Sequence, residues 1–168
     1  GATSVSIGGT PVSSIGANTS TSLIVTPAVG PSGTVTVVNP GGTVTSVGTY
    51  TVNAIPTISS SPSSGTETLC VGGSATPLSV TAAAGSGTIT TYQWYSNTSA
   101  STTGATLVAT NSSAATTDTY TPSTASVGTL YYYVVVTNSN ACPVTSAFTG
   151  AITVNASVSI TAPPSTAT

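Results

Sequence analysis

Only two of the 168 side chains in this sequence, Glu67 and Asp118, are charged at neutral pH. Helix surfaces are usually built from Lys, Arg, Glu and Leu, and the sequence contains no Lys or Arg at all. Thr and Ser fill 65 positions instead, 37 of them Thr, and Thr, Val and Tyr all favour strands. The sequence therefore predicts an all-β protein, because it lacks the residues from which helix surfaces are made.

A chain this rich in Ser and Thr could instead be disordered or a mucin-like stalk. Disordered chains usually combine low hydrophobicity with high net charge. Here the mean hydropathy is +0.37, 38% of the residues are hydrophobic and the net charge is only −2. These values favour a folded chain, and its length suggests one or two domains.

The missing charges exclude several classes of partner. Nucleic-acid binding and attachment to anionic lipid both rest on Lys and Arg, which are absent. The longest apolar run, Leu130 to Val136, is far shorter than the roughly 20 residues that a membrane-spanning helix needs. The start at Gly1 shows no basic and apolar signal-peptide pattern, so we expect any export signal to lie outside this stretch.

The first fifty or so residues contain four strand candidates separated by Gly and Pro. They are Ser4–Ile7, Ser22–Thr26, Gly33–Asn39 and Thr43–Val52. A segment of this size buries too little surface to be a domain by itself, so we expect it to be part of one.

This first segment resembles the IPT/TIG module, an immunoglobulin-like β-sandwich. The phrases that carry the resemblance are "GGTPV", "SGTVTVVNPGGT" and a closing strand that ends in "YTV". The resemblance covers residues 1–54 and lacks the first strands of a complete module. It therefore implies a partial sandwich with an uncovered face and a sheet edge that some other segment must pair with.

Residues 55–61 are expected to form a connector, and residues 62–155 a complete immunoglobulin-like sandwich. Short strands are predicted over residues 75–82, 88–96, 106–109, 118–122, 129–138 and 148–155. Trp94, in "YQWY" of the third strand of this sandwich, occupies the place where such a sandwich has its central core residue. Tyr132 and Val134, in the long strand that follows Gly128, are predicted to lie in the same core. A tyrosine near the start of that strand often anchors a corner through its hydroxyl.

The sequence has only two cysteines, Cys70 and Cys142. A metal site would need more Cys or His ligands, and a catalytic thiol would need a histidine. A disulfide is the simplest interpretation: it would tie the sandwich at one end, indicate an oxidising compartment and stabilise the fold by about 4 kcal/mol. The alternative is a pair of buried free thiols.

The second unit also resembles the immunoglobulin-like modules repeated in very large surface adhesins of gliding Bacteroidota. The matching phrases are "CVGGS", "YQWY", "YTPST", "GTLYYYVVVTNSNAC" and the closing "ITVNA". The resemblance implies export by the type IX secretion system to the cell surface. It also implies a role in adhesion, cell-surface filaments or gliding motility.

Candidate catalytic chemistry is scarce. A Ser nucleophile would have no His or Lys to activate it, and the two carboxylates lie in different segments. We expect Asp118 to cap a turn and Glu67 to be solvated. The sequence therefore predicts no enzyme activity, no metal and no cofactor.

The phrase "TVNA" occurs twice, at residues 51–54 and 153–156, and the spacing of 102 also relates Ile58 to Ile160 and Pro62 to Pro164. The phrase marks the end of a module, so residues 156–168 are predicted to be the first strand of a following module or a linker.

The function hypothesis is that the chain is a structural segment of a long extracellular adhesin. Its expected partners are neighbouring modules, of the same or identical chains, and surface polysaccharide. The alternative is a carbohydrate-binding accessory module, which an exposed row of aromatic side chains would favour and burial of Trp94 would not.

Overall fold

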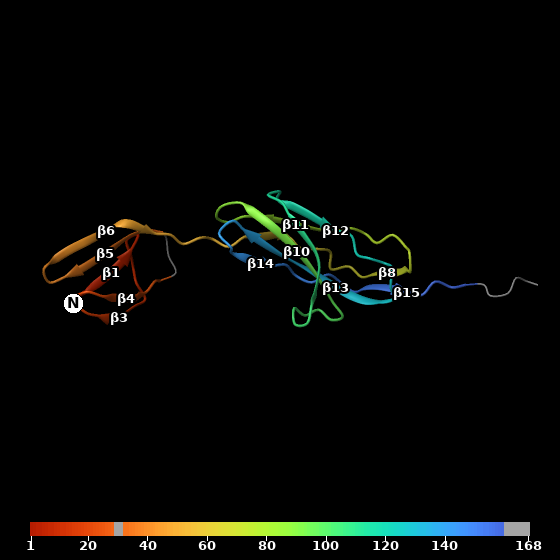
Figure 1. Cartoon of the computed structure of the whole chain (residues 1–168), viewed down its shortest axis with the longest axis horizontal. Coiled ribbons are helices and arrows are strands. Elements are labelled where there is room, and N and C mark those ends of the chain that lie inside the picture. The colour runs from red at the N-terminus through yellow and green to blue at the C-terminus, as the bar shows by residue number, and fades with distance from the viewer. Residues whose placement is uncertain (29–31, 160–168) are drawn as a thin grey trace, which may run out of the picture. The chain divides into compact units, whose positions relative to one another are not determined.

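The computed structural model describes residues 1–28 and 32–159, and all regular structure in those residues is β-strand (Figure 1). The chain divides into two compact units, Gly1–Asn53 and a second unit that begins at Ala54. The protein is all-β, as its composition predicts.

The first unit contains six strands in two small sheets. One sheet has the order β2-β1-β5-β6 and the other pairs β3 with β4. The strands are β1 (Ser4–Ile7), β2 (Thr10–Pro11), β3 (Ser14–Asn18), β4 (Leu23–Thr26), β5 (Gly33–Asn39) and β6 (Gly42–Tyr50). Gly8 and Gly9 both have positive φ, which allows the tight turn that pairs Ile7 with Thr10.

The first unit buries little apolar surface. Val5 and Ile7 are the buried hydrophobic side chains among its described residues. Val44 and Val47 of β6 and Ile24 of β4 are largely exposed. With so few buried side chains, the sheets of this unit gain little stability from a hydrophobic core of their own.

The second unit is an immunoglobulin-like β-sandwich of two sheets. One sheet has the order β12-β9-β7; the other has the order β11-β10-β13-β15-β8, with β14 also paired to β13. The first sheet contains β7 (Thr57–Ser60), β9 (Leu78–Ala83) and β12 (Thr117–Tyr120). The second contains β8 (Glu67–Cys70), β10 (Ile89–Asn97), β11 (Thr106–Ser112), β13 (Gly128–Asn138), β14 (Pro143–Thr145) and β15 (Ile152–Asn155).

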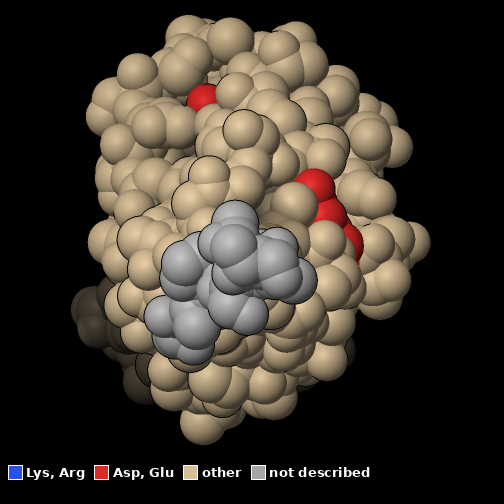
Figure 2. Space-filling model, turned by 90° about the vertical axis from the view of Figure 1, so that its right-hand side faces the viewer, with Lys and Arg blue, Asp and Glu red and all other residues tan. Residues whose placement is uncertain are grey.

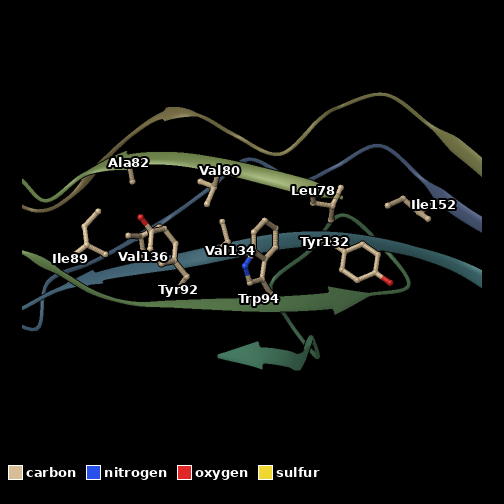
Figure 3. Close-up of a cluster of buried hydrophobic side chains, with 10 residues drawn as sticks. All are labelled: Leu78, Val80, Ala82, Ile89, Tyr92, Trp94, Tyr132, Val134, Val136 and Ile152. Carbon is tan, nitrogen blue, oxygen red and sulfur yellow. The ribbon is translucent and has the colours of Figure 1, made fainter. Parts of the chain in front are cut away.

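The core of this sandwich is formed where β9 of one sheet faces β10 and β13 of the other (Figure 3). Alternate residues along each strand point inward, as the period of two requires. Trp94 and Val134 are fully buried and Tyr132 is 2% exposed, so all three predicted core residues lie in this cluster. The other members are Leu78, Val80, Ala82, Ile89, Tyr92, Val136 and Ile152.

The structure adds two strands, β8 and β14, to those predicted for the sandwich, and it corrects the boundary between connector and sandwich. Residues 55–61, expected to be a connector, contain β7, which pairs with β9 and is the first strand of the sandwich. The Ser-rich sequence of this strand hides it, because only Ile58 points toward the core. At the other end, residues 156–159 have no regular structure, and the rest of the predicted following strand, residues 160–168, lies outside the described residues.

Candidate functional site

Asp118 of β12 joins the two sheets of the second unit through its carboxylate. The indole Nε1 of Trp94 donates a hydrogen bond of 2.7 Å to Oδ2, and Asn111 Nδ2 donates to the same oxygen at 2.9 Å. Trp94 and Asn111 lie on β10 and β11 of the opposite sheet. The expectation that Asp118 caps a turn is wrong, because the residue lies within a strand, opposite Val80. Its acceptor capacity is used for the Trp94 indole, which needs a partner when buried.

Glu67 also has a structural partner. Its carboxylate accepts hydrogen bonds from the backbone N–H of Thr76 at 3.1 Å and from the Thr76 hydroxyl at 2.9 Å. Glu67 is half-buried rather than solvated, and it fixes the loop between β8 and β9. No group of three or more His, Cys, Asp or Glu side chains that could hold a metal occurs in the part of the chain that the structure describes. Because the chain has only two charged side chains, the face of the molecule in Figure 2 is almost wholly uncharged.

Cys70 and Cys142 are free thiols, so the predicted disulfide is wrong. Cys70 is the last residue of β8 and lies opposite Asn155 of β15. The residue before Asn155, Val154, pairs with Gly128. Cys70 therefore lies near the start of β13. Cys142 lies beyond the other end of β13, where its backbone N–H donates to the Asn138 side chain. Ten strand steps separate the two ends of β13, about 30 Å. A disulfide needs Cα atoms within about 7 Å of each other, so the two thiols cannot meet within one module.

We therefore expect the Cys70 thiol to react with iodoacetamide in the native chain without prior reduction, because it is exposed. Mass spectrometry of the alkylated protein measures this directly. Replacing Cys70 with serine should change the free energy of unfolding by less than about 0.5 kcal/mol, as for other surface substitutions. If the thiol reacts only after reduction, and C70S loses much stability, then Cys70 does form a disulfide.

Asn138, at the end of β13, is a structural residue that the sequence did not reveal. It is 1% exposed, and its Nδ2 is within hydrogen-bonding distance of the carbonyl oxygens of Ala54, Ala84 and Ser86, at 2.9–3.1 Å. Its Oδ1 accepts from the backbone N–H groups of Asn140 and Cys142. One amide thus holds the start of the second unit, the β9–β10 turn and the β13–β14 turn together.

The Asn138 contacts bring together segments up to 84 residues apart in the sequence. The local pattern "NSN" indicates a turn, and nothing in it identifies the distant carbonyls. The β9–β10 turn also explains the glycine at position 85. Its φ is +70°, and an added Cβ would lie against the Ala54 and Ile55 carbonyl oxygens.

Three of the six tyrosines of the second unit are buried, and Tyr95, Tyr120 and Tyr131 are half-buried. Tyr92 and Tyr132 belong to the core, and the Tyr133 ring stacks on Tyr95 with 5.1 Å between ring centroids. The Tyr92 hydroxyl donates to the Ala115 carbonyl at 2.6 Å. No hydrogen bond from the Tyr132 hydroxyl to another described residue is found, so the expected corner contact is not made there. Trp94 and three of the six tyrosines therefore pack inside the module, and the other three are only partly exposed.

Burial raises the pKa of four of these phenols above the usual value of 10. They are Tyr92, Tyr120, Tyr132 and Tyr133, and burial raises the pKa of Tyr132 to about 12. Desolvation is the largest cause in each, since it disfavours the phenolate.

We expect the second unit to lose stability at high pH. A phenol whose pKa is higher in the folded state contributes stability that is complete below pH 10 and is lost as the pH rises through about 12. The free energy of unfolding should fall by about 1–2 kcal/mol across that range. Urea titrations at pH 9, 10, 11 and 12, followed by Trp94 fluorescence, measure it. Tyr132→Phe removes the group with the largest shift and should flatten the dependence, and an equally steep fall in that variant would contradict this cause.

No helix in the described residues has the length and hydropathy needed to cross a membrane. Residues 59–156 match the model of a family described as a domain of unknown function, DUF8696. The chain belongs to this family. The DUF8696 match runs from the second half of β7 to the end of β15 and thus covers nearly all of the described sandwich.

No curated protein matches this DUF8696 chain. Among solved structures, it is similar to the fibronectin(III)-like modules of CbhA from Clostridium thermocellum. The sequence identity is 15%, the TM-score is 0.44, and the match covers 91% of this chain and 77% of the other.

Proposed function

We propose that this chain is a structural segment of a long, repetitive extracellular adhesin or cell-surface filament. Its sandwich modules space and display adhesive regions carried elsewhere in the same protein. The first 54 residues are part of an IPT/TIG-type module, and the DUF8696 sandwich is one repeat of the kind found in large Bacteroidota surface proteins exported by type IX secretion. In this proposal the chain performs no catalysis.

The observation that carries the proposal is the position of the chain ends of the sandwich. The polypeptide enters at Ala54, whose carbonyl accepts a hydrogen bond from Asn138 at the end of β13. It leaves after Asn155, and the preceding residue, Val154, pairs with Gly128 at the start of β13. Entry and exit are therefore separated by about the length of an 11-residue strand, some 30 Å. Modules joined through opposite ends lengthen a chain with every repeat, which is what a spacer requires.

The burial of Trp94, Tyr92 and Tyr132 supports this proposal over an accessory module that binds polysaccharide on a flat aromatic surface. Such a module would be favoured by a flat row of exposed rings, whereas Trp94, Tyr92 and Tyr132 are at most 2% exposed. The uncharged surface suits a spacer whose stability must not depend on the salt concentration outside the cell.

The test is to determine the cellular location and the molecular mass of the native polypeptide. We expect antibodies raised against the 168-residue chain to label intact, unpermeabilised cells, and to detect a polypeptide many times heavier than 16.1 kDa. Proteinase K added to intact cells should remove the signal, whereas trypsin should leave this segment uncut because it has no Lys or Arg. A band near 16 kDa, or labelling only after lysis, would contradict the proposal.

Deletion of the gene that encodes the native polypeptide provides the functional readout. We expect the deleted strain to attach to surfaces less well or to lose its surface filaments. Undiminished attachment and unchanged filaments would contradict the adhesive role even if the protein is large and exported.

A further inference from the structure

A cavity of about 380 Å³ lies at the end of the DUF8696 sandwich where β13 begins. It is lined by residues of β10, β11, β12, β13 and β15 and by the loop that leads into Gly128. Its walls include Ser96, Tyr120, Val127, Leu130, Tyr132 and Val154. The volume falls within the range of about 300–1,000 Å³ that is usual for small-molecule sites.

Two residues in the wall of this cavity are largely buried and carry hydroxyls that have no partner among the described residues. Tyr132 is 2% exposed and Ser96 is 8% exposed, and neither side-chain oxygen makes a hydrogen bond to another described residue. They are directly opposite each other on paired strands, so their side chains point to the same face. Among the described residues, every side-chain N or O atom that is fully enclosed has a hydrogen-bond partner. The Tyr132 and Ser96 oxygens have none, so both must be reached by solvent. The cavity that both residues line is the space from which solvent reaches them. In Figure 3 the Tyr132 hydroxyl points away from Trp94.

The rest of the wall is aromatic and uncharged. Tyr120 packs on Tyr132 and on Trp94, with 5.7 Å between ring centroids in each pair. No charged side chain lines the cavity. An anionic ligand would find no cation, since the chain has no Lys, Arg or His. A cationic ligand would find no free carboxylate there, because Asp118 accepts from Trp94 and Asn111 instead.

We propose that this cavity binds one neutral sugar residue of a glycan. Hydroxyls that both donate and accept match the hydroxyls of a sugar, and the half-buried Tyr120 ring matches the apolar C–H face of a pyranose. An apolar side chain from a neighbouring module would fill the space but leave the Tyr132 and Ser96 hydroxyls buried without partners. This binding site goes beyond the spacer function proposed above and does not depend on it.

The experiment is an NMR titration of the ¹⁵N-labelled 168-residue chain with glucose, galactose, mannose and N-acetylglucosamine. At least one of these sugars should produce saturable shifts that cluster on the amides of Ser96, Leu130 and Tyr132. Glucuronate, which carries a charge, and glycerol, which lacks a ring face, should bind at least about tenfold more weakly.

Three variants separate binding from folding. Tyr132→Phe and Ser96→Ala each remove one hydroxyl that has no partner in the protein, so their melting temperatures should stay close to that of the parent chain. Each should weaken sugar binding by about five- to tenfold, the loss expected for one hydrogen bond. The matched control, Tyr95→Phe, removes a hydroxyl from a ring stacked on Tyr133 that does not line the cavity, and should leave binding unchanged.

Several outcomes would overturn the proposal. They are the absence of saturable shifts with every sugar, shifts that map away from the cavity, and equal weakening by Tyr95→Phe. Shifts of the cavity amides that depend on protein concentration without sugar would show a contact between copies instead. None of these results bears on whether the native polypeptide is a surface spacer.

Discussion

Replacing Trp94 with alanine should destabilise the second unit by about 3–5 kcal/mol, the usual cost of removing a large buried aromatic side chain. Trp94 is fully buried between β9, β10 and β13, and its indole N–H satisfies Asp118. Small domains have only about 5–15 kcal/mol of stability in total, so this one change should bring the sandwich close to unfolding. Urea unfolding followed by far-ultraviolet circular dichroism measures the loss, since the variant has no tryptophan fluorescence.

Two further variants divide the effect into its causes. Trp94→Phe keeps most of the apolar volume but removes the N–H donor, so it should cost about 1–3 kcal/mol because Asp118 loses one of its two donors and keeps only Asn111. Leu107→Ala is the matched surface control: Leu107 is 46% exposed on β11, and its loss should cost little beyond about 0.5 kcal/mol. If Trp94→Ala costs no more than Leu107→Ala, Trp94 is not the centre of the core.

The core and the longer strands could be predicted from the sequence because their signals are local, whereas β2, β3, β8 and β14 were not predicted. Alternation places Tyr92 and Trp94 on one face of β10, and Gly and Pro mark where strands end. β7 was missed because three of its four residues are Ser or Thr and only Ile58 packs on the core. A strand that contributes so little to the core has no periodic pattern to detect.

The positions of the cysteines could not be predicted because they depend on strand direction rather than on local pattern. Cys70 precedes β9 and Cys142 follows β13, and the sequence interpretation placed both at one end of the sandwich. The parallel pairing of β8 with β15 and the antiparallel pairing of β15 with β13 put them at opposite ends. The partners of Asp118 and Asn138 were missed for the same reason, since both residues bind groups brought together only by the packing of the sandwich.

Replacing Asn138 with aspartate should destabilise the second unit by about 3–5 kcal/mol at pH 7, the usual cost of a buried charge without a partner. The side-chain amide faces the carbonyl oxygens of Ala54, Ala84 and Ser86, so a carboxylate there would meet three acceptors and no cation. Burial and these oxygens should raise the pKa of the new carboxyl well above its unfolded value of about 3.9. The variant should therefore be most stable at low pH and lose stability as the pH rises above 4.

The measurement is urea unfolding of Asn138→Asp and of the parent chain at pH 3 and pH 7, followed by Trp94 fluorescence. Subtracting the parent removes the contributions of Glu67 and Asp118, the only acidic side chains it contains. Asn140→Asp makes the same chemical change on the same turn at an exposed position, so it should stay within about 0.5 kcal/mol of the parent at both values. At pH 3 the protonated carboxyl of Asn138→Asp can donate to one carbonyl, so part of the loss should be recovered. Equal losses at the two pH values, or similar losses at positions 138 and 140, would mean that the three carbonyl contacts do not hold the entry end of the module together.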